Sequence, residues 1–254
     1  MRIRTLLLAL SVGALAACQD GMTEATGELA TARQTTANAT GASDEATRSY
    51  EITIENLSGG QPFTPPLAAT HRRPADVFTV GEPASVGVQE IAENGNLVPL
   101  ESALMADKHV SGVVIAVGNP PPVLPGGSIT FSIDASPGSK YLSWVSMLIC
   151  TNDGFTGVDA IRLPKKVGDV TSRTTMGYDA GTEINTEDFA DIVSPCPPLT
   201  GVPSTDPGTG TTNPALAEDD VIRHHPGIQG GVDLVPAIHA WTDPVARITV
   251  RRLN

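Results

Sequence analysis

Short stretches in which apolar and polar residues alternate, separated by Gly and Pro, constrain the fold of this chain most. Between 50 and 56, Tyr50, Ile52 and Ile54 alternate with polar residues, which is the pattern of a half-buried β-strand. The segment 128–135 repeats this pattern, and the 25 Gly and 21 Pro residues favour turns over long helices. Further strand signals occur at 113–117, 141–149, 158–163, 170–178 and 245–250. Many short strands with closely spaced turns predict an all-β fold, an antiparallel β-sandwich.

Residues 84–106 differ from the strand-like segments around them. Ser85 is placed to cap a helix that carries Val88, Ile91 and Ala92, and Pro99 suits the first turn of a second helix. We therefore expect short helices in the connections of the sandwich. The strand signal close to the C-terminus also predicts that both ends of the domain join one sheet.

Composition and charge limit the kind of partner. Of the 254 residues, 40% are hydrophobic and only 4% are aromatic, so a core is possible but must consist mainly of aliphatic side chains. The formal net charge is −12. This charge argues against a nucleic-acid partner, because a phosphate backbone needs a basic face.

The N-terminus has the features of an export signal. Arg2 and Arg4 precede an apolar stretch, 6–17, that is too short to span a bilayer. The stretch ends in Leu15-Ala16-Ala17-Cys18, which resembles the lipobox of bacterial lipoproteins. In such precursors the Cys is acylated, for example with palmitate, and becomes the first mature residue. An ordinary signal peptide with a chance Cys is the alternative.

The chain divides into three expected parts. Residues 1–18 are a lipoprotein signal peptide, and 19–47 are a flexible tether, because they are rich in Thr, Ala, Gly and Glu. Residues 48–254 form the β-sandwich domain, with a loop insertion near 197–220 that is dense in Pro, Gly, Thr and Asp. The expected location is a bacterial cell envelope, with a lipid anchor. Gln19 rather than Asp after the Cys implies the outer membrane.

Two cysteines remain when the lipidated one is set aside. They are Cys150 and Cys196. Two thiols of an exported protein generally pair in an oxidising compartment, so a disulfide is expected. Two separate buried thiols and a catalytic Cys are the alternatives.

Acidic side chains lie on Gly-containing turns that border strand-like stretches. Asp153 and Asp159 occur in Cys150-Thr-Asn-Asp-Gly-Phe-Thr-Gly-Val-Asp159, and Asp179 and Glu183 occur in Tyr178-Asp-Ala-Gly-Thr-Glu183. Such turns gather oxygen ligands for a hard cation such as Ca²⁺ at one end of a β-sandwich. Because Asn-Asp-Gly is also ordinary turn chemistry, the alternative is that these residues only shape turns.

Several segments, in order along 50–252, together resemble the spondin N-terminal domain in its bacterial lipoprotein form. These segments are Tyr50-Glu-Ile-Thr-Ile-Glu-Asn-Leu57, Gly81-Glu-Pro-Ala-Ser85, Ile91-Ala-Glu-Asn-Gly95, Leu124-Pro-Gly-Gly127, Ser146-Met-Leu-Ile-Cys-Thr-Asn-Asp-Gly-Phe-Thr-Gly-Val-Asp159, Tyr178-Asp-Ala-Gly-Thr-Glu183, Gly227-Ile-Gln-Gly230 and Trp241-Thr-Asp-Pro-Val-Ala-Arg-Ile-Thr-Val250. The resemblance implies a β-sandwich related to C2 domains, with bound Ca²⁺. Animal members of the family are adhesion proteins of the extracellular matrix.

The resemblance also assigns metal ligands. The acidic loop pattern of the family falls on Asp153 and Asp159, and its Asp-Ala-Gly-Thr pattern falls on Asp179; Glu183 is the nearest further acid. Animal members usually place a bulky aromatic residue directly after the first Asp. Here Gly154 takes that position, which implies a more mobile loop and a weaker metal site.

Three functions remain open. The expected one is a calcium-binding, envelope-anchored module, not an enzyme, that binds an extracellular or periplasmic protein or glycan, as in adhesion. The runner-up is an envelope hydrolase that uses His239 with Asp243, or the acidic cluster with a metal. The sequence contains no Gly-x-Ser-x-Gly nucleophile motif, which argues against a serine hydrolase. The third is a purely structural lipoprotein.

The lipobox leads to a direct test of anchoring. Substituting Cys18→Ser removes the thiol that would be acylated, so the variant should leave the membrane fraction or fail to mature. Fractionation of cells that express the parent or the variant measures this. A variant that sediments with membranes like the parent would show that the lipid anchor is wrong.

Overall fold

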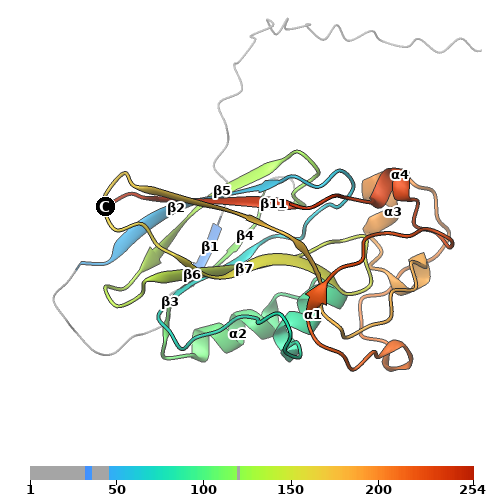
Figure 1. The fold of residues 1–254 in the computed structure, drawn as a ribbon, viewed down its shortest axis with the longest axis horizontal. Coiled ribbons are helices and arrows are strands. Elements are labelled where there is room, and N and C mark those ends of the chain that lie inside the picture. The colour runs from blue at the N-terminus through green and yellow to red at the C-terminus, as the bar shows by residue number, and fades with distance from the viewer. Residues whose placement is uncertain (1–31, 36–45, 119–120) are drawn as a thin grey trace, which may run out of the picture.

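Two antiparallel β-sheets face each other, with helices beneath the larger one (Figure 1). The computed structural model describes residues 32–35, 46–118 and 121–254. Its strands are β1 Ala32–Thr35, β2 Arg48–Asn56, β3 Leu67–His71, β4 Val110–Ala116, β5 Ser128–Ala135, β6 Tyr141–Met147, β7 Gly154–Arg162, β8 Val170–Thr175, β9 Gly177–Asp179, β10 Arg223–His224 and β11 Ala246–Arg252. Its helices are α1 Val86–Asn94, α2 Val98–Ala106, α3 Cys196–Thr200 and α4 Pro236–His239, with short 3₁₀ turns η1 Phe189–Asp191 and η2 Pro214–Leu216. The predicted all-β sandwich is confirmed.

Strand order shows how the ends of the domain meet. The large sheet runs β1-β4-β3-β6-β7-β9-β10, and the small sheet runs β5-β2-β11-β8. Strand β2, the first of the small sheet along the chain, pairs with the last strand, β11, from Asn56 opposite Ala246 to Tyr50 opposite Arg252. The prediction that both ends of the domain join one sheet is therefore confirmed.

The core between the sheets follows from period-two patterning. On β2, Tyr50, Ile52 and Ile54 are fully buried and pack with aliphatic residues of β5 and β11. Trp144 of β6 enters the same cluster from the facing sheet. Strands of the small sheet bury one face only, because their other face meets solvent. The alternation that predicted these strands therefore reflects their burial.

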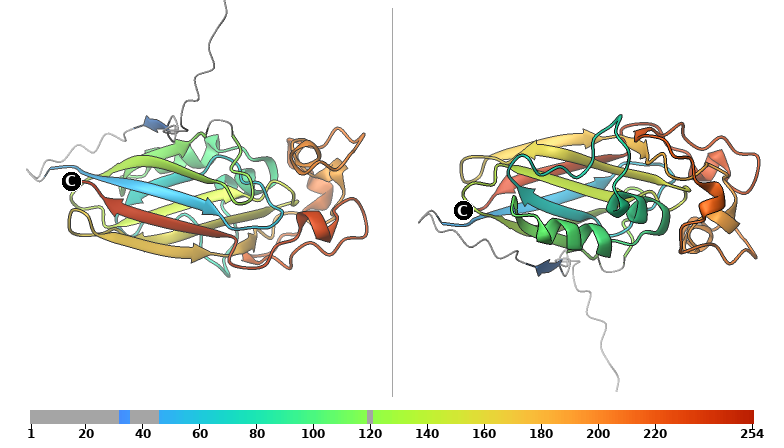
Figure 2. Two further views of the ribbon diagram at one scale, coloured as in Figure 1. Left: turned by 90° about the horizontal axis from the view of Figure 1, so that it is seen from above. Right: turned by 90° about the horizontal axis from the view of Figure 1, so that it is seen from below.

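A second core lies on the outer face of the large sheet. Val88 and Ile91 of α1 and Leu100 of α2 pack there against Val113 and Val145 of the sheet. Seen from below, the two helices cross this face (Figure 2). Because both faces are covered, β3 is buried at every position and β6 at all but its first. The sequence Leu-Ala-Ala-Thr-His of β3 does not alternate, so its strand escaped prediction.

Both predicted helices are present. The Ser85 side chain accepts a hydrogen bond from the Val88 amide at 3.3 Å, as expected for an N-cap, and Gly95 ends α1 in the left-handed conformation with a φ of 62°. Pro99 lies in the first turn of α2. Local capping chemistry thus sets both ends of α1, and Pro99 in the first turn marks the start of α2.

The outer segments differ from expectation in two places. Strand β1 lies within 19–47, predicted as a tether, and pairs with β4 at the edge of the large sheet. The insertion near 197–220 contains α3 and η2 and forms short bridges to the neighbouring loops, such as Val193 with Thr209. Cys18, the signal peptide and most of the tether lie outside the described residues. In the part of the chain described, no helix is both long and apolar enough to cross a membrane.

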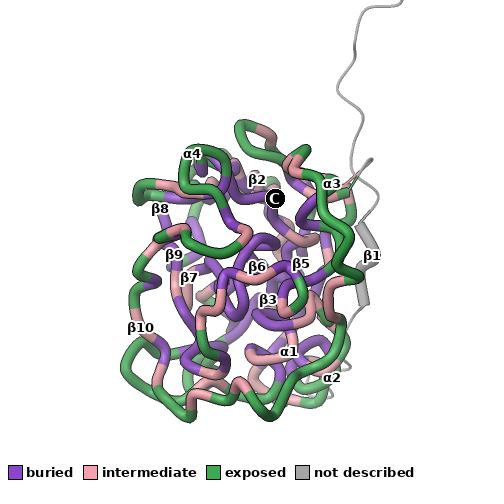
Figure 3. The backbone as a smooth tube through the Cα atoms, turned by 90° about the vertical axis from the view of Figure 1, so that its right-hand side faces the viewer, coloured by how far each residue is buried: buried purple, intermediate pink, exposed green. Residues whose placement is uncertain are grey.

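A disulfide joins the turn after β6 to the start of α3, at the end of the sandwich where β6 meets β7. Cys150 and Cys196 are bonded, with Cα atoms 5.1 Å apart, which confirms the predicted pairing. The buried Gln61 side chain accepts from the Cys150 amide at 3.0 Å and donates to the His239 carbonyl at 2.7 Å. Viewed onto this end, exposed loops surround buried segments (Figure 3). Covalent and polar contacts therefore hold these loops against the sheet.

The disulfide leads to a stability prediction. The double substitution Cys150→Ala and Cys196→Ala should lower the free energy of unfolding by up to about 4 kcal/mol, because the bond restricts an unfolded chain over a sequence separation of 46. Denaturant unfolding measures the loss. The reduced parent should unfold at the same denaturant concentration as the double variant. If reductant does not change the denaturant midpoint of the parent, the result would contradict the disulfide bond.

Candidate metal centre

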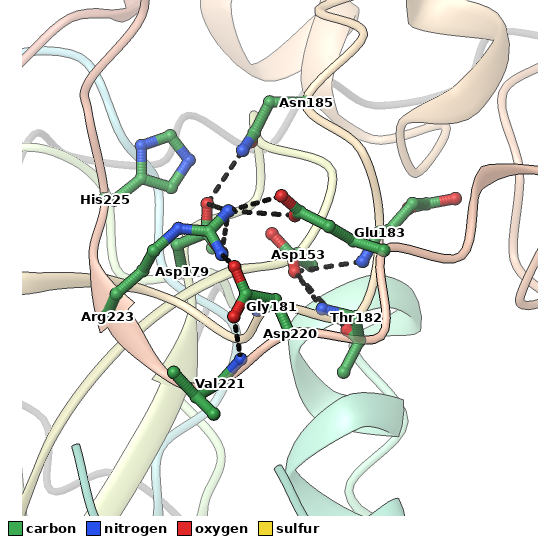
Figure 4. Close-up of polar contacts among 12 residues, drawn as sticks. Asp153, Asp179, Gly181, Thr182, Glu183, Asn185, Asp220, Val221, Arg223 and His225 are labelled. Atoms are coloured by element: carbon green, nitrogen blue, oxygen red, sulfur yellow. Dashed lines mark hydrogen bonds and ion pairs between the residues drawn. The ribbon is translucent and has the colours of Figure 1, made fainter. Parts of the chain in front are cut away.

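Strand pairing brings two of the predicted ligands together. Gly154, the first residue of β7, lies opposite Asp179, the last residue of β9. Asp153 therefore sits beside Asp179, and its carbonyl accepts the Ala180 amide at 3.1 Å. Both carboxylates are fully buried. Figure 4 shows the two carboxylates near each other, with the backbone amide of Glu183, which follows β9, donating to Asp153.

Asp153 has one satisfied and one unsatisfied carboxylate oxygen. Its Oδ2 accepts the backbone amides of Thr182 at 2.8 Å and Glu183 at 3.1 Å. Its Oδ1 is buried and has no hydrogen-bond partner. A buried carboxylate oxygen without a partner is costly, and native proteins rarely leave one so unless a water or an ion completes it.

Asp179, in contrast, is saturated. Its Oδ1 accepts the Gly181 amide at 2.9 Å, and its Oδ2 accepts the Asn185 side-chain amide at 2.7 Å. The Arg223 guanidinium lies 3.2 Å from Oδ1, 2.8 Å from Glu218 and 2.5 Å from Asp220, so it bridges three acids (Figure 4). Arg223 thus supplies a positive charge to one side of the cluster.

Burial and nearby acids raise the pKa values of Asp153 and Glu183. Burial, and then the nearby Asp179 charge, raise the pKa of Asp153 to about 7. Burial, followed by the charges of Glu93 and Asp153, raises the pKa of Glu183 to about 8. Both shifts mean that the ionised carboxylates lack sufficient compensating charge. The cluster therefore favours a proton or a cation at this side.

Asp159 does not join this cluster, contrary to the expectation from the resemblance. It lies six positions along β7 from Asp153, on the order of 20 Å away in an extended strand. Its Oδ1 accepts the Val77 amide at 3.1 Å and the Ser143 hydroxyl at 2.8 Å. Because the strand carries Asp159 away from the loop that holds Asp153, the two carboxylates cannot bind the same ion.

Asp159 belongs instead to a buried polar network at a bulge between β6 and β7. Ser143 Oγ donates to Asp159, accepts the Ala160 amide at 2.9 Å and lies 2.8 Å from His71 Nε2. These contacts fill the hydrogen-bonding capacity of the hydroxyl. Both Ser143 and His71 are buried, so this Ser-His-Asp set stabilises the strand irregularity and is not a nucleophile exposed to substrate.

His239 and Asp243 are engaged with different partners. His239 is fully buried, its Nδ1 accepts the Val235 amide at 2.8 Å, and its Nε2 lies 3.1 Å from Thr200 Oγ1. Asp243 accepts the Gly177 amide at 3.0 Å. The structure thus gives each residue a packing or turn role and does not pair them.

Two other groups of potential ligands converge more tightly. Within the described ranges, the ligand atoms of Cys150, Cys196 and His239 lie within 4.8 Å of one another, as do those of Asp188, Asp206 and Asp233. The first group contains the disulfide, so its sulfurs are not thiolates. In the second group, Asp188 and Asp233 already accept the amides of Ala190 and Phe189.

The residues around Asp153 fit a hard cation. The unpartnered Asp153 Oδ1, with Glu183 and Asp179 beside it, offers the oxygen donors that Ca²⁺ prefers. Reasoning from the sequence missed Glu218 and Arg223, which come from the end of the insertion and from β10. No local pattern marked them, because only the pairing of Arg223 with Asp179 across β9 and β10 brings them here.

The comparisons with known proteins agree with this architecture. The family model described as Spondin_N matches residues 56–191, more than half of the 254 residues. The match includes Asp153, Asp179 and Glu183 and excludes Arg223. A search of the curated proteins finds no match. With its antiparallel sandwich and the extent of this match, the chain belongs to the spondin N-terminal domain family.

Proposed function

We propose that this protein is a calcium-binding, envelope-anchored module that binds a protein or glycan, as an adhesion domain does. Membership of the spondin N-terminal domain family suggests an extracellular adhesion-type module. The observation that carries the calcium proposal is the fully buried Asp153 carboxylate, which has one oxygen without a partner. Its neighbours in the cluster are acidic, so a bound cation would offset their combined negative charge.

Asp153 and Glu183 are the residues that would bind the ion directly. Asp179, whose oxygens already accept hydrogen bonds, would add negative charge beside it. Backbone carbonyls and water would complete a shell of six to eight oxygens. The ion would supply positive charge next to Asp153, with which Arg223 forms no ion pair. It would also hold the 150–153 turn against the loop after β9. These are loops at one end of a rigid sandwich, where binding modules commonly carry their recognition surface.

The hydrolase alternative has less support. His239 contacts Val235 and Thr200, whereas Asp243 contacts Gly177. Ser143, His71 and Asp159 are adjacent, but the first two are buried and the hydroxyl donates directly to the carboxylate. A general base requires a reachable substrate proton, and these residues face the interior.

Calcium should raise the melting temperature of the chain from Gln19 onward, and a chelator should reverse the gain. Binding to the folded state alone is worth about 2.7 kcal/mol at a hundredfold excess over the dissociation constant. We expect that constant near 10⁻⁴ to 10⁻³ M, on the order of other extracellular modules. Asp153→Asn should abolish the response. Calorimetry and thermal melting provide the measurements.

Two matched substitutions act as controls. Asp206→Asn removes an acid from the other convergent group, and Asp159→Asn removes one from the buried network, so both should keep the calcium response. Loss of the calcium response in Asp206→Asn but not in Asp153→Asn would show that calcium binds at the group that contains Asp206 instead. Calcium-dependent capture of an envelope protein or glycan by the parent, but not by Asp153→Asn, tests the binding role. Capture that ignores both calcium and this substitution would refute it.

The raised pKa values predict how stability changes with pH. Folded Asp153 and Glu183 keep their protons up to pH about 7 and about 8, whereas their ordinary values are 3.8 and 4.5. Between these values the folded state binds more protons than the unfolded state. The free energy of unfolding in chelator should therefore fall as the pH rises from 4 to 8, by a few kcal/mol at most.

Melting from pH 5 to pH 8, with calcium and with chelator, measures this effect. Calcium replaces the protons, so its stabilising effect should be larger at pH 8 than at pH 5. In chelator, the stability of Asp153→Asn should fall less steeply with rising pH than that of the parent. Parallel slopes for the two proteins would show that Asp153 is not the titrating group.

A further inference from the structure

A basic cavity lies at the opposite end of the sandwich from the acidic cluster. Its volume is about 550 Å³. Five cationic residues line it, namely Arg48, Lys140, Arg162, Lys165 and Arg252, and no Asp or Glu of the described ranges does. The strands confirm its position, because β7 begins beside Asp153 and ends at Arg162. In Figure 1 this is the end that carries the C-terminus.

The concentration of positive charge is unusual for this chain. The protein has only 16 Lys and Arg residues against 28 acids, and its net charge is −12. Elsewhere on the small sheet, arginines form ion pairs: Arg247 pairs with Glu55 at 3.2 Å and Arg251 with Glu51 at 2.8 Å. Among the described residues, no ion pair is formed by Lys140, Arg162 or Lys165. These three cations converge without a compensating carboxylate from the part of the chain that the structure describes.

The walls of the cavity are held in place by the fold. The Leu163 amide donates to the Lys140 carbonyl at 2.9 Å, which fixes the start of β6 against the end of β7. The buried Tyr50 hydroxyl donates to the Pro164 carbonyl at 3.3 Å. Arg252 Nη1 donates to the Lys165 carbonyl, and its Nε donates to the Asn254 carbonyl at 2.5 Å. Mutual repulsion of the cations is thus resisted by backbone contacts.

We propose that this cavity binds a phosphate-bearing anion. Guanidinium groups offer forked donors that match tetrahedral oxyanions, and the ammonium groups of Lys add charge. The cavity is also roomy enough for the group that carries the phosphate. Two sources share this chemistry, namely the headgroup of an anionic lipid and a soluble phosphate compound. The inference is independent of the calcium proposal, because the two sites lie at opposite ends of the strands.

Titration of the chain from Gln19 onward, which keeps every described residue, tests the proposal. Isothermal calorimetry with inorganic phosphate, and with acetate as the control anion, measures recognition of the phosphate group. Sedimentation with phosphatidylglycerol vesicles, and with phosphatidylcholine vesicles as the control, measures recognition of a lipid headgroup. We expect phosphate to bind in preference to acetate, and the double variant Arg162→Glu/Lys165→Glu to bind at least about tenfold more weakly.

A single charge reversal outside the cavity, compared with the single reversals Arg162→Glu and Lys165→Glu, separates the effect of the cavity from that of net charge. Arg173→Glu changes an exposed arginine of β8 that does not line the cavity, so it should bind like the parent. Binding to phosphatidylglycerol vesicles would identify a lipid source, and binding to phosphate alone a soluble one. Equal affinity for phosphate and acetate with no preference for phosphatidylglycerol, or an equal loss in Arg173→Glu, would overturn the proposal. Circular dichroism of each variant confirms folding.

Discussion

Burial of the large sheet on both faces is the constraint on which the rest of the structure depends. One face meets the small sheet through Trp144 and its neighbours, and the other meets α1, α2 and the long loops. Strand β6 consequently has almost no exposed residue, and the turn after it enters the interior. The disulfide and Gln61 then fasten this turn, which is why acidic residues on a loop become fully buried.

Burial of the Asn-Asp-Gly turn places the Asp153 carboxylate in the interior, where its negative charge is costly. Asp153 and Asp179 are adjacent because β7 pairs with β9, and Arg223 compensates only Asp179 among the two. Leaving a carboxylate uncompensated in the interior costs several kcal/mol, so the group must hold a proton or meet a cation. The same fold places Asp159 away from this cluster, and its Oδ1 accepts hydrogen bonds from Ser143 and Val77.

The domain is electrically polarised along its strands. Acids gather where β6 ends and β7 begins, whereas cations gather where β6 begins and β7 ends. Nine residues of β7 separate the two ends, a distance of roughly 30 Å in an extended strand. Salt screens charges over about 8 Å at physiological ionic strength, so the ends act independently. One rigid sandwich can therefore present two surfaces of opposite sign.

The sequence alone determined the sandwich, the two helices and the pairing of Cys150 with Cys196, because alternation, the Ser85 cap, Pro99 and the cysteine count can all be recognised in the sequence. It did not reveal β3, because a strand covered on both faces does not alternate. Only the tertiary structure separated Asp159 from Asp153, since it showed that Asp159 lies inside the extended strand β7 and Asp153 in the turn before it. It alone brought Arg223 to Asp179 and five cations to one cavity, because strand pairing joins residues that are far apart in the chain.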